Sequence, residues 1–309
     1  MPVSQLTRLA HRLVVPAVLC ASLSCSGGQE SAEHPTAPSP FGVLGLFAGG
    51  PAVLVGAGDI ARCDTPGAAL TAKLLDGISG TVFVAGDNAY MDGSAREYRD
   101  CYGPTWGRHR DRTRPVPGNH EYQTPNAAGY FGYFGASAGP SSQGYYSYTL
   151  GPWFVLALNS EVPLGAGSGQ LEWVRGQLQA NPRPCTLVYW HRPLFSSGRN
   201  GPNVDMRDLW RALYDLDVDV VVNGHDHLYE RFAPQTPEGR PDPVKGIRQF
   251  TVGTGGAPLY PVMATTVNSE VAFSAWGVAS FTLQQGGYGW TFLPADGHAS
   301  RDAGAGACH

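Results

Sequence analysis

The most informative stretch of the sequence is Val220-Val221-Val222-Asn223-Gly224-His225-Asp226-His227-Leu228-Tyr229-Glu230-Arg231. Its consecutive valines predict a buried strand, and the glycine that follows frees the backbone to turn. The two histidines lie two residues apart, and in an extended chain such residues share a face. His225 and His227 can therefore point into one site and bind neighbouring metal ions. The alternative is a pair of surface histidines without a ligand.

Four other predicted strands also end in residues of the types that bind metals. They are residues 51–59, which end in Gly58-Asp59; 81–87, which end in Gly86-Asp87; 114–121, which prolines keep short and which end in Gly118-Asn119-His120-Glu121; and 186–190, which run into His191. Five strand ends of this kind favour a shared site over isolated surface residues.

Helical patterns alternate with these strands. Residues 65–76 predict a helix with Thr65 as N-cap and Pro66 in its first position, and residues 169–181 and 205–217 predict two amphipathic helices. Further strands are expected at 153–159, 249–253, 278–283 and 289–293, whereas residues 122–151 are expected to form a long surface excursion. This alternation indicates an α/β fold, in which sites lie at the carboxyl ends of strands.

The composition narrows the class of protein. The chain has 309 residues, of which 42% are hydrophobic, enough to bury the core of one large domain. Its 41 glycines and 25 prolines make a helical bundle an unsuitable interpretation. The formal net charge of −4 gives no indication of a nucleic-acid partner.

The first residues resemble an export signal. Arg8, His11 and Arg12 precede the apolar run 13–23, which is too short for a mature membrane span. We therefore expect an export signal over residues 1–25, a flexible tether over 26–50 and a globular domain over 51–309. The sequence around Cys25 resembles a bacterial lipoprotein cleavage site, although Ser22 replaces the usual aliphatic residue. A lipid on Cys25 is the one membrane contact that we expect of this exported protein.

Four cysteines remain beyond the signal, an even number in an exported chain, and we expect disulfides. The sequence allows three pairings. We favour Cys63 with Cys101, because both follow predicted site strands, which leaves Cys185 with Cys308. A zinc site is the competing interpretation, but no CxxC spacing supports it.

Together the five motifs resemble those of calcineurin-like metallophosphoesterases, and of purple acid phosphatases in particular. They occur in the family's order, as Gly58-Asp59, Gly86-Asp87-Asn88-Ala89-Tyr90, Gly118-Asn119-His120-Glu121, Val188-Tyr189-Trp190-His191 and Gly224-His225-Asp226-His227. The resemblance spans residues 51–296. It implies a four-layer sandwich in which two mixed β-sheets are flanked by helices.

The resemblance also implies two metal ions. Asp59, Asp87, Tyr90 and His227 would bind the first, Asp87 would bridge to the second, and Asn119, His191 and His225 would complete the second site. The residues Asp59-Ile60-Ala61 lack the histidine that many family members carry there, and Tyr90 takes its place. A phenolate suits Fe(III), so we expect iron in the first site and Fe, Zn or Mn in the second.

The implied reaction is hydrolysis of a phosphate ester by a metal-bound hydroxide. Two cations activate water and neutralise phosphoryl oxygens. His120 is expected to contact the phosphoryl group and to protonate the leaving alkoxide, or alternatively to orient a ligand. Glu121 and Asp226 are candidates to hydrogen-bond the ligating imidazoles. A phosphomonoesterase is favoured; a phosphodiesterase or nucleotide hydrolase, and a non-catalytic surface binding module, are the alternatives.

Overall fold

The computed structural model describes residues 50–140, 143–297 and 302–309. The predicted export signal, the lipidation of Cys25 and all but the last residue of the predicted tether lie outside the described residues. In the part of the chain that is described, no helix combines the length and apolar character needed to cross a membrane.

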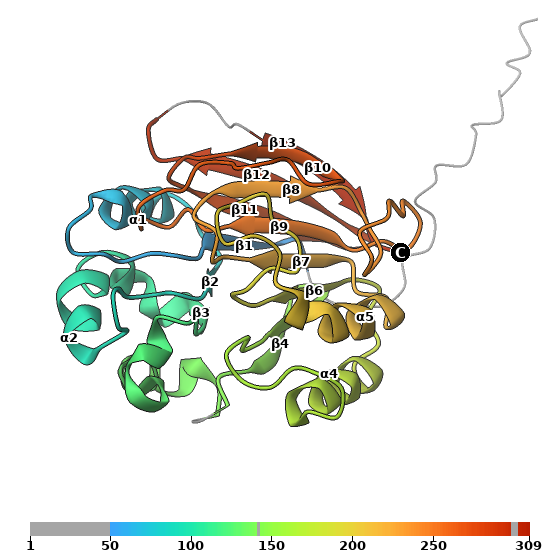
Figure 1. Cartoon of the computed structure of the whole chain (residues 1–309), viewed down its shortest axis with the longest axis horizontal. Coiled ribbons are helices and arrows are strands. Elements are labelled where there is room, and N and C mark those ends of the chain that lie inside the picture. The colour runs from blue at the N-terminus through green and yellow to red at the C-terminus, as the bar shows by residue number, and fades with distance from the viewer. Residues whose placement is uncertain (1–49, 141–142, 298–301) are drawn as a thin grey trace, which may run out of the picture. The chain divides into compact units, whose positions relative to one another are not determined.

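Two β-sheets form the centre of the domain (Figure 1). The first has the strand order β13-β12-β11-β1-β2-β3. Its strands are β1 Ala52–Ala57, β2 Thr81–Ala85, β3 Thr113–Val116, β11 Gly277–Gln284, β12 Gly287–Pro294 and β13 Asp302–Ala307. The second has the order β10-β8-β9-β7-β6-β5-β4. Its strands are β4 Tyr146–Leu150, β5 Trp153–Ala157, β6 Thr186–Tyr189, β7 Val220–Asn223, β8 Tyr229–Phe232, β9 Arg248–Val252 and β10 Ser269–Phe273.

Both sheets are mixed. Strands β1, β2 and β3 run parallel, as do β5, β6, β7 and β9, whereas the strands at the other edges pair antiparallel. The backbone N–H of Gly58, just beyond β1, donates to the carbonyl of Val252 at the end of β9 with an N–O distance of 2.8 Å. The carboxyl ends of parallel strands from the two sheets therefore meet at one edge, where the predicted ligands lie.

The side chains of β5, β6 and β7 alternate between two cores. Val220 and Val222 belong to the larger core, which includes Phe83, Phe250 and Phe281. Val221 faces the other way, into a second core beneath helices α4 Gly169–Ala180 and α5 Arg207–Asp215. This period of two is the geometry of a strand buried on both faces. It explains why the opening stretch is an uninterrupted valine run.

The remaining helical segments are shorter. They are the α-helices α1 Gly67–Asp76, α2 Ala95–Glu97 and α3 Ala128–Phe134, the π-helix Tyr98–Tyr102, and the 3₁₀ segments Trp106–Arg112, Glu121–Gln123, Pro125–Ala127, Gly135–Ala138 and Val204–Met206. With these helices on the outer faces of two mixed sheets, the predicted four-layer fold class is confirmed.

Two local predictions were wrong. The first long helix begins at Gly67, after Pro66, and the hydroxyl of Thr65 donates to the carbonyl of Gly256 at 2.8 Å instead of capping that helix. Residues 122–151 do not form a surface excursion throughout, because Tyr130 and Phe134 of α3 are buried in the larger core. Their spacing of four residues places both rings on the inner face of a helix.

The favoured disulfide pairing is confirmed: Cys63 bonds to Cys101 and Cys185 bonds to Cys308. The second bond joins the residue that precedes β6 to the residue that follows β13, so it links the two sheets covalently.

Candidate metal centre

Three of the predicted ligands of the first ion surround one hydroxyl group. The hydroxyl of Tyr90 lies 2.8 Å from Oδ1 of Asp59 and 3.1 Å from Nε2 of His227. It also lies 3.1 Å from Oδ2 of Asp87. The side chains that follow β1, β2 and β7 therefore converge as the motif order predicts.

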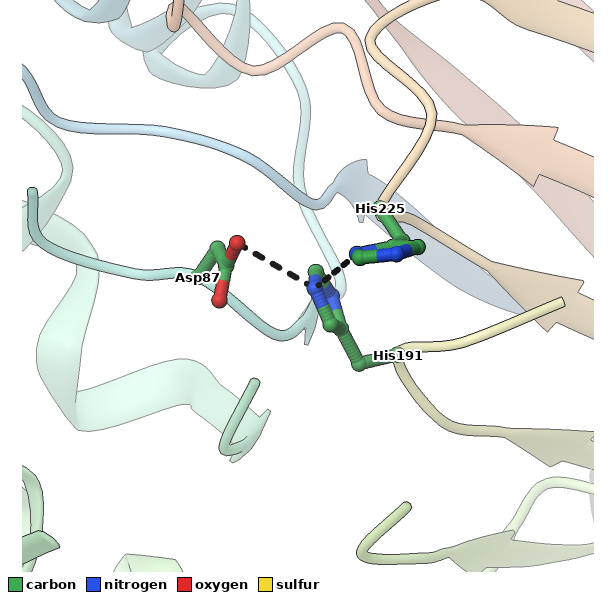
Figure 2. A group of neighbouring side chains, drawn as sticks. All are labelled: Asp87, His191 and His225. Carbon is green, nitrogen blue, oxygen red and sulfur yellow. Dashed lines mark hydrogen bonds and ion pairs between the residues drawn. The ribbon is translucent and has the colours of Figure 1, made fainter. Parts of the chain in front are cut away.

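In the second group, His191 lies between Asp87 and His225 (Figure 2). Nε2 of His191 is 3.2 Å from Oδ2 of Asp87 and 3.2 Å from Oδ1 of Asn119. Nδ1 of His225 is 3.2 Å from the same Nε2. Oδ2 of Asp87 thus faces both groups, which is the position that a bridging carboxylate needs.

The centre is removed from solvent. Asp59 and His191 are 0% exposed, and Asp87 is 1% exposed. A buried carboxylate is costly unless a cation or hydrogen-bond donors compensate its charge. Backbone N–H groups of His225 and His120 donate to Oδ2 of Asp59 and Oδ1 of Asp87. The other two carboxylate oxygens face imidazoles and the phenol of Tyr90, an arrangement that favours bound cations.

Backbone carbonyls fix the orientation of two imidazoles. Nδ1 of His191 lies 2.9 Å from the carbonyl of Ala85, and Nδ1 of His227 lies 2.6 Å from that of Pro258. A carbonyl accepts only, so each Nδ1 carries the proton and each Nε2 presents its lone pair to the centre. The ring of Tyr260 stacks on that of His227, with centroids 4.0 Å apart.

The pKa values show how the centre behaves electrostatically. Burial opposes protonation of His191, yet the Asp87 carboxylate raises its pKa to about 10. Burial, together with the charges of His191 and Arg192, lowers the pKa of His225 to about 3. Burial and the carboxylates of Asp59 and Asp87 raise the pKa of Tyr90 well above its usual range. The centre therefore selects positive charge next to Asp87, where a metal ion would replace the proton on His191.

His120 borders the same carboxylate. Its backbone N–H donates to Oδ1 of Asp87 at 2.9 Å, and its Nε2 lies 3.8 Å from Oδ2. Nδ1 lies 2.5 Å from the carbonyl of Met91, so the ring is oriented with Nε2 toward the centre. The side chain is 24% exposed, which leaves this nitrogen accessible to a bound substrate.

A model of the calcineurin-like phosphoesterase family matches residues 55–229, more than half of the chain. The chain belongs to this family. The matched range contains all seven predicted ligands and His120, and the resemblance deduced from the five motifs is confirmed.

Several relatives of this chain are purple acid phosphatases. Purple acid phosphatase 21 of Arabidopsis thaliana is 28% identical over 256 residues, which cover 75% of this chain and 54% of that protein. The structure of purple acid phosphatase PPD1 from yellow lupin superposes with a TM-score of 0.69 at 19% identity, covering 84% of this chain and 54% of that one. The chain therefore spans about half the length of these two relatives.

The same fold occurs in a protein described by a different role. GAP50, the anchor in the inner membrane complex of Plasmodium, superposes with a TM-score of 0.66 at 16% identity, covering 84% of this chain and 89% of that one. At these identities the two superpositions show the fold, and the chemistry has to be argued from the side chains.

Glu121 plays a different part from the one predicted. Its Oε1 accepts from the N–H groups of Asn88 at 2.9 Å and Ala89 at 3.2 Å, and from the hydroxyl of Tyr98 at 3.1 Å. Its Oε2 accepts from the N–H of Gly118 at 2.7 Å. The carboxylate thus ties the turn after Asp87 to the turn before Asn119 instead of contacting an imidazole.

Asp226 also binds a loop. Its Oδ2 accepts from the hydroxyl of Ser196 at 2.5 Å, and its Oδ1 accepts from the N–H of Asn200 at 2.7 Å. The amide of Asn200 in turn donates to the carbonyl of His225 at 2.7 Å. The carboxylate between the two histidines therefore holds the loop 196–200 against the turn that presents them.

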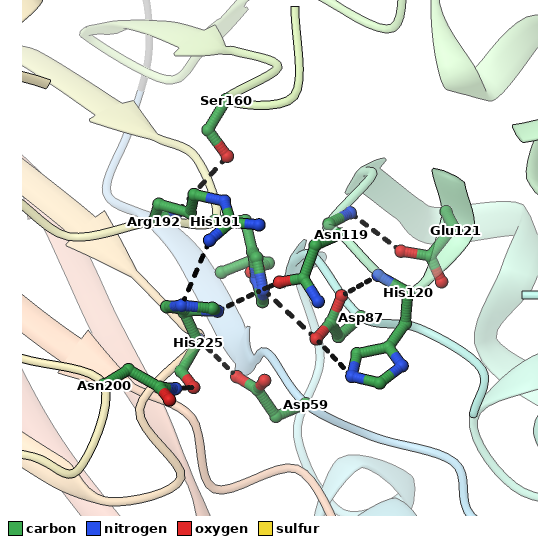
Figure 3. Close-up of polar contacts among 12 residues, drawn as sticks. Asp59, Asp87, Asn119, His120, Glu121, Ser160, His191, Arg192, Asn200 and His225 are labelled. Carbon is green, nitrogen blue, oxygen red and sulfur yellow. Dashed lines mark hydrogen bonds and ion pairs between the residues drawn. The ribbon is translucent and has the colours of Figure 1, made fainter. Parts of the chain in front are cut away.

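Sequence reasoning missed Arg192, which directly follows His191. Its Nη1 lies 3.4 Å from Nε2 of His225 (Figure 3). The ion pair with Glu161 holds it there. The sequence did show an arginine next to a proposed ligand, but Glu161, which positions that arginine, lies 31 residues away in the chain.

Proposed function

We propose that this phosphoesterase hydrolyses phosphate monoesters with two metal ions. The observation that carries the proposal is the position of Oδ2 of Asp87, 3.1 Å from the Tyr90 hydroxyl and 3.2 Å from Nε2 of His191. One oxygen atom facing two separate donor groups is what a dinuclear site requires, and it has no evident use in a mononuclear one.

The donor types suit the predicted metals. Asp59, Tyr90 and His227 would bind the first ion with Asp87, and the phenol oxygen of Tyr90 is a hard donor that favours Fe(III). Asn119, His191 and His225 would complete a second site for Fe, Zn or Mn. When bound, such ions lower the pKa of water and neutralise phosphoryl oxygens.

The chain's own residues would position the ester and supply the proton. Nδ1 of His120 faces the Met91 carbonyl, so in the imidazolium form Nε2 carries a proton directed toward the centre. An ester oxygen next to Asp87 would lie within reach of that proton. His120 would then act as general acid toward the leaving alkoxide, which otherwise departs as a strong base.

We propose that the protein is exported and works outside the cytoplasm, in the extracellular space, in the periplasm or anchored by a lipid to the cell surface. The two disulfides fit an oxidising compartment. The amino-terminal residues resemble an export signal, and Cys25 is the proposed site of a lipid. With a net charge of −4, we propose a phosphate ester and no nucleic acid as partner.

The test combines metal analysis with a substrate panel on the full chain. We expect two metal ions per chain, a tyrosinate-to-iron absorption band, and higher kcat/KM for a monoester than for a diester. A faster diester would support the phosphodiesterase alternative. Fewer than two ions together with no hydrolysis of either would overturn the proposal and favour a binding module, a role for which the fold of GAP50 gives a precedent.

A further inference from the structure

A cavity of about 650 Å³ lies beside the metal centre, and the proposed hydrolysis does not yet use it. It is lined by residues 160–165, which follow β5, by Arg192, and by residues 203–208, which precede and begin α5. Arg192 joins the cavity to the second group of ligands, because it lines the cavity and its Nη1 lies 3.4 Å from Nε2 of His225. We call it the leaving-group cavity.

Arg192 is held rigidly at the wall of this cavity. Its Nε donates to Oε1 of Glu161 at 2.9 Å and its Nη2 donates to Oε2 at 3.1 Å. The hydroxyl of Ser160 donates to Oε1 of Glu161 at 2.9 Å. The side chains of Arg192 and Glu161 are 28% and 11% exposed, so this two-bond pair is largely shielded from water. Nη1, on the other edge of the guanidinium, faces His225.

Nη1 of Arg192 keeps an N–H group that can donate into the cavity. A guanidinium nitrogen can only donate, and Nη1 carries two N–H groups. The contact with Nε2 of His225 uses at most one of them, which leaves the other for an oxygen atom bound in the cavity that Arg192 lines.

The rest of the lining indicates what that oxygen belongs to. Glu161, Asp205 and Asp208 bring three carboxylates, whereas Arg192 and Arg207 bring two guanidinium groups. A second phosphate would meet an excess of negative charge there. Hydroxyl groups can both donate to carboxylates and accept from arginine, and therefore match this lining.

We infer that the leaving-group cavity binds the alcohol portion of the ester and that this alcohol carries several hydroxyl groups, as in a sugar or polyol phosphate. Arg192 donates from Nη1 to one of its oxygens and acts as a specificity-determining residue. This inference rests on the proposed monoester hydrolysis and adds the substrate class.

The test compares two esters on the metal-loaded full chain: a sugar phosphate, and phenyl phosphate, whose alcohol has no further hydroxyl group. We expect Arg192→Met to lower kcat/KM for the sugar phosphate at least tenfold more than for phenyl phosphate, mainly through KM. Arg192→Lys keeps the charge but loses the two-bond pair, and should show a smaller change in the same direction. Arg211→Met is the matched control, because it also removes an arginine–glutamate pair, with Glu238 at 2.8 Å, away from the cavity.

Each outcome is decisive. Equal losses for both esters, or none, would overturn the role of Arg192 while wild-type hydrolysis of phenyl phosphate still supports the proposed function. No hydrolysis of either ester by the wild type with both metals bound would overturn the proposed function, and the cavity assignment with it. Metal content and Tm of each variant separate these results from misfolding, and the change must be absent in Arg211→Met.

Discussion

Replacing Glu121 by alanine tests whether a buried carboxylate, and not the metal ligands alone, builds the centre. Glu121 is 0% exposed and accepts from three backbone N–H groups, those of Asn88, Ala89 and Gly118. In Glu121→Ala these groups lose their acceptor. A buried donor left unsatisfied costs about 1–3 kcal/mol, so the three would cost roughly 3–9 kcal/mol.

The cost of burying the Glu121 carboxyl group offsets part of the stabilisation that its hydrogen bonds provide. Burial and the Asp87 carboxylate raise the pKa of Glu121 to about 8, although the N–H groups of Gly118 and Ala89 act to lower it. We therefore expect a loss near the lower limit, about 3 kcal/mol of unfolding free energy. Because the lost bonds flank Asp87 and Asn119, metal occupancy should fall as well.

Glu97→Ala is the matched control. Glu97 also accepts from three backbone N–H groups, those of Met91, Asp92 and Ser94, and completes a capping box at the start of α2. Its surroundings are open to water, which replaces the lost acceptor, so we expect a cost of about 1 kcal/mol. Urea unfolding of the metal-free proteins measures both. A difference below about 0.5 kcal/mol between the variants would refute the reasoning, and Glu121→Gln provides the same comparison if the alanine variant does not fold.

Four further predictions concern separate parts of the protein. His120→Ala should lower kcat about 100-fold or more while leaving two metals bound, as measured by turnover and elemental analysis; loss of metal would instead assign His120 to ligand orientation. Tyr90→Phe should abolish the tyrosinate-to-iron absorption band, and a band that persists would contradict the assignment of iron to the first site. Removing the Cys185–Cys308 bond should destabilise the protein by about 1 kcal/mol more than removing the Cys63–Cys101 bond. The first bond closes a loop of 123 residues and the second a loop of 38, so the first restricts the unfolded chain more. Denaturant unfolding of the two double-serine variants measures the difference. Hydrogen bonding to Asp219 raises the pKa of His309, so protonated His309 stabilises the fold below pH 6.5, and this contribution is lost as the pH rises through the raised pKa. The difference in unfolding free energy between the wild type and His309→Gln should therefore shrink between pH 5.5 and 8.5. A difference that stays constant over this range would disprove the role of His309.

Elements with strong periodic patterns were predictable from the sequence. Strands β1, β2, β5, β6 and β7 are continuous apolar runs because both of their faces are buried. β13 was not predicted, since Asp302–Ala307 contains only Asp, Ala and Gly and has little strand propensity of its own. It is held by pairing with β12 and by the disulfide at Cys308, and neither interaction can be seen in a local pattern.

The candidate site was predictable where the residue types themselves indicate metal binding. The seven proposed ligands were found because Asp, Asn, Tyr and His recur after strand ends. Arg192, Glu161 and Glu121 were missed or misassigned because their functions come from partners that only the folded chain brings close. The sequence does not show where the side chain of Arg192 points, because its partner Glu161 comes from the loop after β5.

The glycines of the motifs show why ligand and backbone had to be selected together. A Cβ atom on Gly86 would lie 2.5 Å from Nδ1 of His191, and one on Gly118 would overlap Oδ1 of Asp87. Each glycine is therefore packed against a proposed ligand from a different motif. Asp59, Asp87 and His225, which follow glycines, themselves adopt left-handed backbone conformations with φ of 61°, 49° and 72°. Such conformations cost about 1 kcal/mol or more each and persist only where the surrounding structure imposes them. The close approach of the strand ends is thus what brings Asp87, Asn119 and His191 within 3.2 Å of one another, and a side chain in place of either glycine would displace His191 or Asp87 although no ligand had been changed.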